Sequence, residues 1–469
     1  MSTSNDTVDL RDQRFLVVGL GASGLAAAKL LCERGARVSV NDVRSEAELG
    51  ERAAEVRALG MELVCGEHPS ALFTSVDHII VSPGVPPLPA LDEAERAGVP
   101  ISSEIELASW FVAGRIVGIT GTNGKSTVTT LIGQMSERAG LPTFVGGNLG
   151  RPLVEVVGTD AAGPNGVVVV ELSSFQLERV TRLRVHVALL LNVTDDHLDR
   201  YADFDAYVAA KARIFERQQA ADFAVLPAGD ARCRRAFEEQ GAVAAARYFG
   251  RVTEPGADGV YAADGVLTDA RTGLSLPTSA LKLRGGHNVD NACAAALACG
   301  LLGVPASVVE AVLRDFGGLG HRMQHVLERQ GVTYYDDSKA TNVGAAVAAL
   351  DGLADLDAHG GRVVLIAGGR DKGGSYQPLV EAMRARGRGA VLIGDATPLL
   401  RDAFAGEPLP RVEARDMDAA VRAAADLAEP GDVVVLAPAC SSFDWYGGYA
   451  ERGRDFQRAV RALAQGGGS

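Results

Sequence analysis

The strongest chemical signal in the chain is a glycine-rich turn between an apolar strand and a helix, Gly121-Thr122-Asn123-Gly124-Lys125-Ser126-Thr127. Its glycines let backbone amides converge on an anion, and the helix N-terminus adds a positive dipole. Lys125 can reach terminal phosphates, and the hydroxyl of Ser126 or Thr127 can coordinate Mg²⁺. Ile119 stands where the common phosphate loop has its first glycine, so this turn is a shortened variant. We therefore predict a nucleoside triphosphate site.

Two acidic segments follow buried strands of the same region. Glu171 ends the valine run 167–170, where a carboxylate is costly unless a cation such as Mg²⁺ pairs with it. The alternative is that Glu171 caps the turn at 172–174. After the next apolar run, 187–192, the loop Asp195-Asp196-His197-Leu198-Asp199 gathers like charges that need a cation or a helix dipole. His197 is either a metal ligand or a structural imidazole.

A second glycine turn lies near the N-terminus. Gly19-Leu20-Gly21-Ala22-Ser23-Gly24 matches a dinucleotide-binding pattern, and Asp42 ends the next strand, where an acid would bind a ribose hydroxyl. Such a turn binds any pyrophosphate, so we predict a nucleotide there, with NAD as one candidate and a turn without ligand as the alternative. Ser82 and Gly84 follow another strand and could add donors to the same crevice.

Cations and hydroxyls gather in three C-terminal loops: Gly320-His321-Arg322, the segment 336–342 (Asp-Asp-Ser-Lys-Ala-Thr-Asn) and the segment 368–374. Guanidinium and ammonium groups suit a phosphate or a dicarboxylate. The alternative is ordinary turn chemistry, because Asp, Ser, Asn and Gly favour turns.

Along the chain, predicted strands alternate with predicted helices, and these elements must position the loops described above. This rhythm, with continuous apolar runs, predicts an α/β fold with parallel sheets. We predict three domains: a Rossmann-like domain at 1–112, a central P-loop ATPase-like domain at 113–318 and a C-terminal Rossmann-like domain at 319–469. The polar, weakly periodic stretch at 228–281 indicates irregular strands and loops. The uncharged run 292–309 indicates two small-residue helices rather than a membrane span.

Composition narrows the class of function. The 469 residues, of which 47% are hydrophobic, are too many for one core. With a net charge of −13, the chain as a whole does not attract nucleic acid or an anionic membrane electrostatically. Six scattered cysteines and a polar N-terminus without a signal-peptide pattern indicate the cytoplasm. We expect no nucleic-acid partner and no membrane insertion.

Taken together, the motifs resemble one family, the Mur ligases, over nearly the whole chain. The resemblance rests on the phosphate turn, Glu171-Leu172-Ser173-Ser174-Phe175-Gln176, the segment 192–200, His287-Asn288 with Asn291, His321-Arg322 and the segment 337–342. The last segment resembles the glutamate-adding branch. The resemblance implies an ATP-dependent ligase that joins D-glutamate to UDP-N-acetylmuramoyl-L-alanine through an acyl phosphate and a tetrahedral intermediate. Such an enzyme serves peptidoglycan synthesis, cell shape and cell division, and we expect a monomer.

The resemblance also implies roles for individual residues. The expected catalytic residues are Lys125, Glu171, His197, Lys211 and Arg322. The expected nucleotide-binding residues are Gly121, Thr122, Asn123, Gly124, Lys125, Ser126, Thr127, Asn288, Arg322 and Asp337. The expected ligands of two Mg²⁺ ions are Ser126, Glu171, His197 and Lys211. The expected substrate-binding residues are Ala22, Ser23, Asp42, Arg44, Ser82, Gly84, Asn148, Lys339, Thr341, Lys372, Ser442 and Phe443, with Tyr449 nearby.

Lys211 shows how much of this depends on the resemblance. It lies on a predicted helix at 204–216, and that pattern alone indicates a solvated lysine. The resemblance instead implies a carbamylated lysine that supports the second metal ion.

Three alternatives stay open. A related ligase of the family could use L-glutamate or another amino acid, because Asp371 and the segment 444–448 depart from the family pattern. A dehydrogenase would explain the turn at 19–24 but not the phosphate turn. A P-loop ATPase that acts as a switch would explain Lys125 but leave the segment 337–342 without a role.

Overall fold

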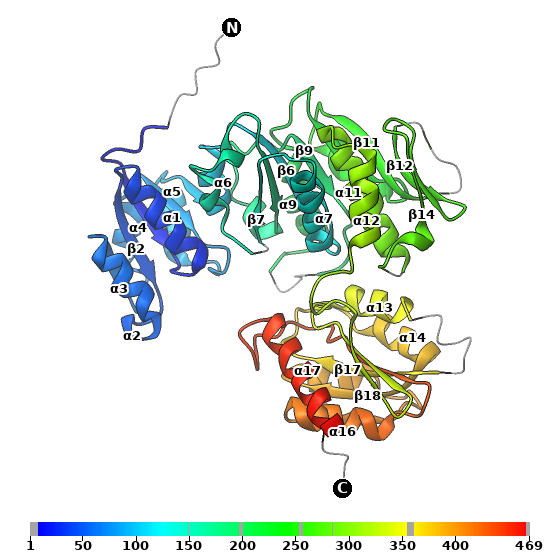
Figure 1. Ribbon diagram of the computed structural model, residues 1–469. Coiled ribbons are helices and arrows are strands. Elements are labelled where there is room, and N and C mark those ends of the chain that lie inside the picture. Colours follow the sequence, from blue (N-terminus) through cyan, green and yellow to red (C-terminus); the bar gives the residue numbers. More distant parts are fainter. Residues whose placement is uncertain are drawn as a thin grey trace. The chain divides into compact units, whose positions relative to one another are not determined.

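The computed structural model describes residues 8–148, 150–196, 200–252, 256, 258–283, 285–353 and 361–465. Its strands form three sheets, built in turn from residues 14–103, 115–277 and 324–436 (Figure 1). By internal contacts the chain falls into two compact units. Unit 1 comprises 1–192, 208–278 and 291–313, and unit 2 comprises 193–207, 279–290 and 314–469. The α/β class is confirmed, while the domain boundaries at 112/113 and 318/319 stay a prediction.

The N-terminal sheet is wholly parallel, with the strand order β3-β2-β1-β4-β5. Its strands are β1 (Arg14–Val18), β2 (Arg37–Asp42), β3 (Glu62–Cys65), β4 (His78–Val81) and β5 (Ile101–Ser103). Its helices are α1 (Ala22–Glu33), α2 (Glu46–Leu49), α3 (Glu51–Ala58), α4 (Ser70–Thr74), α5 (Pro89–Arg96) and α6 (Glu104–Ser109). The order reverses between β1 and β4, so the loops after these two strands flank the crevice where such sheets bind ligands.

The central sheet has the order β14-β13-β12-β11-β10-β9-β6-β8-β7. Its strands are β6 (Arg115–Thr120), β7 (Thr143–Gly147), β8 (Val167–Glu171), β9 (Val187–Leu190), β10 (Phe223–Pro227), β11 (Ala245–Arg251), β12 (Gly259–Ala263), β13 (Val266–Asp269) and β14 (Leu274–Pro277). Only the pairs β12/β13 and β13/β14 of these strands are antiparallel. Because β6 lies between β8 and β9, the loops that follow all three strands meet at one edge of the sheet.

The register of β6 and β8 places Glu171 beside the phosphate turn. Ile119 is paired with Glu171, and the four valines before Glu171 are fully buried. At the end of the pair, the Leu172 amide donates to the Ile119 carbonyl at 2.8 Å. The Thr120 hydroxyl donates to the Leu172 carbonyl, also at 2.8 Å. The strand register therefore places Glu171 beside the start of the phosphate turn.

The helices of the central region differ in part from the prediction. They are α7 (Lys125–Arg138), α8 (Ser174–Leu177), α9 (Phe204–Ala212), α10 (Ala231–Glu239), α11 (Gly286–Leu302) and α12 (Ala306–Asp315). The strands expected at 228–281 are present as β11–β14, but the prediction missed α10 in the same segment. Asp230 caps α10 by accepting the amides of Arg232 and Cys233, and its buried face consists of Cys233, Ala236 and Phe237. The two small-residue helices expected at 292–309 are confirmed as parts of α11 and α12.

The C-terminal sheet has the order β15-β16-β20-β17-β18-β19, with only β15 of these strands antiparallel to its neighbour. Its strands are β15 (Gln324–Arg329), β16 (Val332–Asp336), β17 (Val363–Gly368), β18 (Gly387–Ile393), β19 (Arg411–Glu413) and β20 (Val433–Leu436). Its helices are α13 (Val343–Asp351), α14 (Gln377–Arg386), α15 (Thr397–Ala403), α16 (Met417–Leu427) and α17 (Tyr449–Gln465). Since β16, β20 and β17 are neighbours, the loops that follow them share one edge of the sheet.

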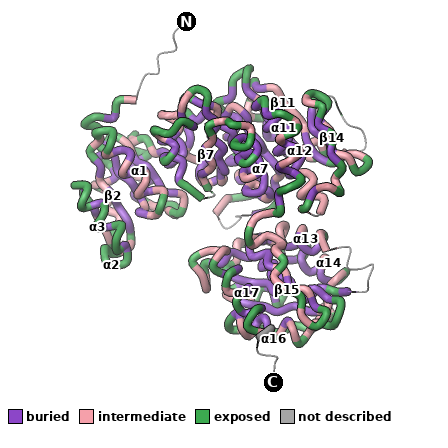
Figure 2. Tube along the Cα trace, viewed as in Figure 1, coloured by how far each residue is buried: buried purple, intermediate pink, exposed green. Residues whose placement is uncertain are grey.

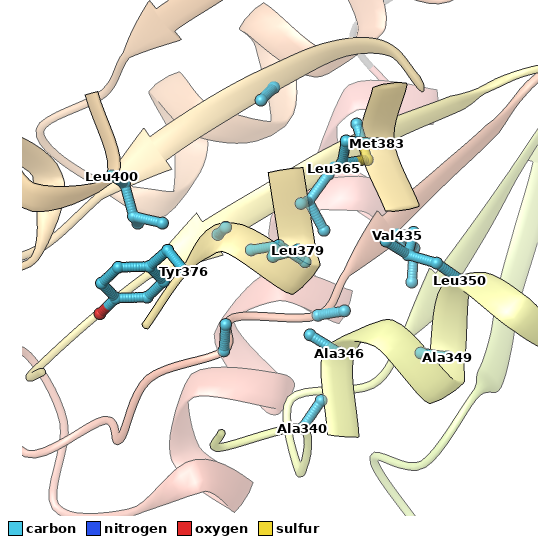
Figure 3. Packing of buried hydrophobic residues seen from close by; sticks show 14 of the residues in the cluster. Ala340, Ala346, Ala349, Leu350, Leu365, Tyr376, Leu379, Met383, Leu400 and Val435 are labelled. Carbon is cyan, nitrogen blue, oxygen red and sulfur yellow. The ribbon is translucent and has the colours of Figure 1, made fainter. Parts of the chain in front are cut away.

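Both faces of this sheet are covered by apolar side chains. Leu365 and Val435 point to one face, where they meet Leu350, Leu379 and Met383 (Figure 3). A second cluster around Phe456 covers the other face. In all three sheets the buried residues follow the strands, and exposed residues follow the outer surfaces of helices and loops (Figure 2). Within the described ranges, no helix is long and apolar enough to cross a membrane.

Candidate functional site

The phosphate turn has the backbone geometry that a cradle for an anion needs. Gly121 has φ 144° and Gly124, the N-cap of α7, has φ 87°, both in the region that favours glycine. A Cβ on Gly124 would overlap the Oδ1 of Asn291, one of the residues of the predicted motifs. The turn therefore passes too close to α11 for any larger residue. Ser126 and Thr127 follow in the first turn of α7, and both are buried.

Two lysines share one carbonyl oxygen of this turn. Lys125 Nζ donates to the carbonyl oxygens of Gly121 and Thr122, both at 2.8 Å. Lys211 Nζ donates to the same Gly121 oxygen at 2.9 Å. Lys211 is only 2% exposed, so the expectation of a solvated side chain from its helix pattern was wrong. The structure thus brings two predicted catalytic cations to the first residue of the turn.

Asn192 shapes the turn and was not singled out as a site residue from the sequence. The Asn123 amide donates to Asn192 Oδ1 at 2.9 Å, and Asn192 Nδ2 donates to the Asn123 carbonyl at 3.0 Å. The Thr122 amide donates to the Asn192 carbonyl at 3.0 Å. The Asn192 side-chain amide thus pairs with the Asn123 backbone as the backbone of a neighbouring strand would. Its place directly after the apolar run 187–191 is the signal that could have identified it.

Glu171 is buried, and one of its carboxylate oxygens has no hydrogen-bond partner among the described residues. Its residue exposure is 3%, and its Oε1 accepts the side-chain amide of Asn148 at 2.8 Å. Its Oε2 is buried and has no hydrogen-bond partner in the described part of the chain. A buried, unmatched carboxylate oxygen beside a phosphate cradle fits a hard cation such as Mg²⁺. Asn148 thus holds Glu171, and its expected contact with a ligand stays a prediction.

The remaining predicted metal ligand, His197, lies outside the described residues, as does Asp199. Where the chain is described, no group of three His, Cys, Asp or Glu side chains is arranged to hold a metal ion. Asn288, expected at the nucleotide, lies in the first turn of α11, and its amide donates to the Gly285 carbonyl at 3.0 Å.

In the N-terminal domain, Asp42 organises the glycine turn. Its Oδ2 accepts the Leu20 amide at 2.7 Å, and Arg44 donates to both carboxylate oxygens at 2.9 and 2.7 Å. Burial opposes ionisation, but the hydrogen bonds of Arg44 and of the Arg44 and Leu20 amides outweigh it, so the pKa of Asp42 falls to about 2. Across the switch point, the Ser82 hydroxyl donates to the Gly19 carbonyl at 2.7 Å.

At the same crevice, the N-terminal end of α1 is accessible to solvent. Ala22 and Ser23 begin α1, and Ala22 and Gly84 are exposed. The predicted uridine-nucleotide residues thus include two that hold the turn, Asp42 and Ser82, and others that are accessible to a ligand.

In unit 2, Arg322 is presented by a strained segment. Its neighbours His321 and Met323 have φ 61° and 42°, which is uncommon for residues with side chains. His321 Nδ1 lies 2.6 Å from Asp336 Oδ2, and its carbonyl accepts the Lys339 amide. The Met323 amide donates to Asp337 Oδ1 at 3.2 Å.

Asp337 is itself perturbed by this environment. Burial raises the pKa of Asp337 to about 6, although Arg322 and the Met323 amide lower it in part. A carboxyl group whose pKa is raised by burial, in a loop that also carries Lys339, is typical of functional sites.

The predicted amino-acid site lies on the three loops after β16, β17 and β20. Lys339 Nζ lies 3.2 Å from the Tyr449 hydroxyl and 4.3 Å from the centre of its ring. Thr341 follows in the same loop, Ser442 is buried, and the Phe443 side chain is exposed. Lys372 Nζ lies 3.4 Å from Asp196 Oδ1. The structure therefore brings Lys339, Lys372 and Ser442 to one edge of the sheet.

Asp371 and Tyr376 shape the loop that carries Lys372. The Tyr376 ring belongs to the apolar cluster (Figure 3), and its hydroxyl lies 3.1 Å from the Sγ atom of Cys440 in the same cluster. This hydroxyl donates to Asp371 Oδ1 at 2.5 Å, and the Gly373 amide donates to Asp371 Oδ2 at 2.9 Å. Burial, followed by the nearby Cys440 and Asp371, raises the pKa of Tyr376. Asp371 is thus a loop-forming residue.

Arg452 joins two of these loops and was missed by the sequence reasoning. Its guanidinium, 1% exposed, donates to the Ser338 hydroxyl and carbonyl and to the carbonyls of Cys440 and Ser441. Burial lowers the pKa of Arg452 to about 10. A signal was present, because Arg452 falls on the same helical stripe of α17 as Phe456, Ala459 and Val460. An arginine on the apolar face of a helix indicates that its guanidinium is buried and hydrogen-bonded to other parts of the chain.

Family descriptions match the chain in three places. They are the Mur ligase MurD-like N-terminal domain over residues 13–103, the Mur ligase middle domain over 119–299, and the Mur ligase glutamate ligase domain over 321–440. The chain therefore belongs to the Mur ligase family, and its three-domain α/β organisation is confirmed.

Relatives within the family carry one particular name. The chain is 44% identical to the UDP-N-acetylmuramoylalanine--D-glutamate ligase of Geobacter metallireducens, over 98% of this chain and 99% of the relative. It is 43% identical to the ligase of the same name from Trichlorobacter lovleyi, over 97% of this chain and 100% of the relative. Among solved structures, the UDP-N-acetylmuramate-alanine ligase of Thermotoga maritima shares the fold, with a TM-score of 0.58 and 19% identity over 96% of this chain and 100% of that chain.

Proposed function

We propose that this chain catalyses the ATP-dependent addition of D-glutamate to UDP-N-acetylmuramoyl-L-alanine, a step of peptidoglycan precursor synthesis. The observation that carries the proposal is the 44% identity over nearly the full length with ligases of that activity. The phosphate turn beside the buried, unmatched Glu171 Oε2 supports the ATP-dependent half of the reaction. We also propose a cytoplasmic location, since all six cysteines are free thiols.

The chemistry explains why cations surround the turn. A carboxylate is a poor electrophile, so its oxygen first attacks the γ-phosphate, which forms an acyl phosphate and releases ADP. The amine of glutamate then attacks the acyl carbon, and the tetrahedral intermediate expels phosphate. Two anions about 4 Å apart repel by about 4 kcal/mol at an effective dielectric constant near 20. The first step therefore needs fixed positive charge at the phosphates.

We assign the phosphates to the turn and its lysine. The Gly124 amide and the Lys125 ammonium would contact them, whereas the amides of Thr122 and Asn123 already donate to Asn192. Lys125 would exchange its bonds with the Gly121 and Thr122 carbonyls for phosphate oxygens. Asn288 would contact the adenine, Asp337 the ribose, and Arg322 the phosphates.

The residues around Glu171 fit Mg²⁺. Ser126 and Glu171 would hold one ion, and His197 with a carbamylated Lys211 a second; when bound, the metal supplies positive charge between the reacting anions. Carbamylation would replace the Lys211 ammonium by a neutral nitrogen with a single N–H, so the contact with the Gly121 carbonyl would lose its positive charge.

We assign the two carbon substrates to different loops. The uridine nucleotide would bind Ala22, Ser23, Arg44 and Gly84, on the turn that Asp42 and Ser82 hold in place. Asn148 would contact the same substrate near Glu171. The incoming amino acid would bind the set Lys339, Thr341, Lys372, Ser442 and Phe443.

The test measures phosphate release with ATP, Mg²⁺ and UDP-N-acetylmuramoyl-L-alanine. D-glutamate should stimulate release, whereas L-glutamate and diaminopimelate should not. Stimulation by L-glutamate would favour the related ligase, and no stimulation by any amino acid would refute the ligase activity. Lys125→Met removes the charge at a similar side-chain length and should largely abolish the stimulated release. Binding of nicotinamide nucleotides in place of uridine nucleotides would favour a dehydrogenase.

A further inference from the structure

Asp196 places a carboxylate among the loops that we assign to the incoming amino acid. Its Oδ1 lies 3.4 Å from Lys372 Nζ, and its Oδ2 accepts the side-chain amide of Asn342 at 3.1 Å. The segment 193–207, which contains Asp196, belongs by its contacts to unit 2. Asp196 is only 7% exposed, so this carboxylate is held inside the unit and not on its surface.

Lys372 and Asn342, two partners of Asp196, come from neighbouring loops of the C-terminal sheet. Asn342 ends the loop after β16 and caps α13 by accepting the Ala345 amide at 2.8 Å. Lys372 lies in the loop after β17. Ligands of open α/β sheets bind at this edge, beyond the carboxyl ends of the strands. The Asp196 carboxylate therefore lies where a substrate carboxylate would meet Lys372.

We propose that Asp196 is an internal counter-ion that competes with a carboxylate of the incoming amino acid for Lys372 and thereby sets the affinity for that substrate. The inference rests on the proposed function, because that function assigns Lys372 to the amino acid. A partly buried ammonium is stabilised by a nearby counter-ion, so Asp196 stabilises the loop before the substrate binds.

The geometry makes this contact replaceable. The distance of 3.4 Å exceeds the 2.7–2.9 Å that is usual for a charge-assisted hydrogen bond. The Lys372 side chain is 20% exposed, whereas the Asp196 side chain is 6% exposed, so an anion in solution can approach the lysine from the open side. The bond to Asn342 gives Asp196 a partner that stays when Lys372 turns to the substrate.

The first test measures the chemical reactivity of Lys372 and needs no catalysis. Acetic anhydride labels the native protein, and mass spectrometry of its peptides gives the labelling rate of Lys372. In Asp196→Asn the rate should rise several-fold, and glutarate should protect Lys372 at a roughly tenfold lower concentration than in the wild type. Asp195→Asn is the matched control, because Asp195 is the exposed neighbour. Equal labelling and equal protection in Asp196→Asn and the wild type would overturn the inference.

The second test measures the KM for D-glutamate. Asp196→Asn should lower this KM by roughly tenfold without a matching rise in kcat, since only the competition is removed. A KM that stays the same or rises would overturn the inference. If Asp196→Asn does not fold, Asp196→Ser is measured in the same way. If the wild type shows no release with D-glutamate, the proposed function fails, while the labelling result still decides whether Asp196 shields Lys372.

Discussion

Glu104, the first residue of α6, gives a prediction whose magnitude follows from the structure. It is 1% exposed, and its Oε1 accepts the Val154 amide at 2.6 Å from the short 3₁₀ helix at Leu153–Val156. Its Oε2 is buried without a hydrogen-bond partner in the described part of the chain. Burial raises the pKa of Glu104 from 4.5 to about 7, against the opposing effect of the Val154 and Leu153 amides.

The sign of the effect on stability follows from this raised pKa. Below pH 4.5 the carboxyl is protonated in both states and costs nothing. As the pH rises from 4.5 to 7, the unfolded chain releases the proton and the folded chain keeps it, so the free energy of unfolding falls. A shift of about 2.5 units at about 1.4 kcal/mol per unit gives a cost of about 3 kcal/mol that is complete above pH 7.

The perturbation is Glu104→Gln, which keeps the shape and removes the charge. At pH 8 the variant should unfold with a free energy about 3 kcal/mol higher than the wild type, and at pH 5 the gain should shrink below about 1 kcal/mol. Urea denaturation followed by tryptophan fluorescence measures both, because Trp110 lies just after α6. Glu67→Gln, at an exposed glutamate, is the control. A gain that is equal at both pH values would refute the reasoning.

Four further predictions concern the site. Lys125→Met should lower kcat/KM for phosphate release by about 100-fold or more with an unchanged Tm. Gly124→Ala should lower the Tm and weaken binding of an ATP analogue in calorimetry, since φ 87° strains alanine by about 1–2 kcal/mol and its Cβ would overlap Asn291. Arg452→Met should cost about 3 kcal/mol in urea denaturation and raise the KM for D-glutamate, and Arg452→Lys should not restore it. The affinity for ADP should fall below pH 6 as Asp337 takes up a proton, and Asp337→Asn should remove this pH dependence in calorimetry; equal profiles would contradict the ribose contact.

The parts of the molecule that the sequence predicts well are those with local causes. The valine run 167–170 can only be a strand buried on both faces, and the turn at 121–127 carries its glycines at the positions where positive φ occurs. The helix α10 was missed because its apolar face consists of only three residues, although Asp230 at its start is a cap signal.

The pairing of side chains could not be predicted in the same way. Nothing local to Asp42 shows that the Leu20 amide occupies its carboxylate, because this contact depends on the pairing of β1 with β2. Lys211 is buried against Gly121, 90 residues earlier, and no helix pattern records such a contact. Likewise, the contact of Asp196 with Lys372 joins residues 176 positions apart. Local sequence patterns predict the helices and strands, whereas these long-range side-chain contacts become visible only in the folded structure.

The strand β8 has no internal marker of its alignment with β6. Four consecutive valines with identical shape and burial could slide by one position with little change in packing, yet such a slip would turn Glu171 to the opposite face of the sheet. The alignment is instead fixed at the ends of the pair. The Arg115 amide donates to the Gly166 carbonyl at 3.0 Å at one end, and the Thr120 hydroxyl donates to the Leu172 carbonyl at the other. The Thr120 hydroxyl thus fixes the position of Glu171 along β8 relative to the phosphate turn, although Thr120 itself bonds only to the strand end.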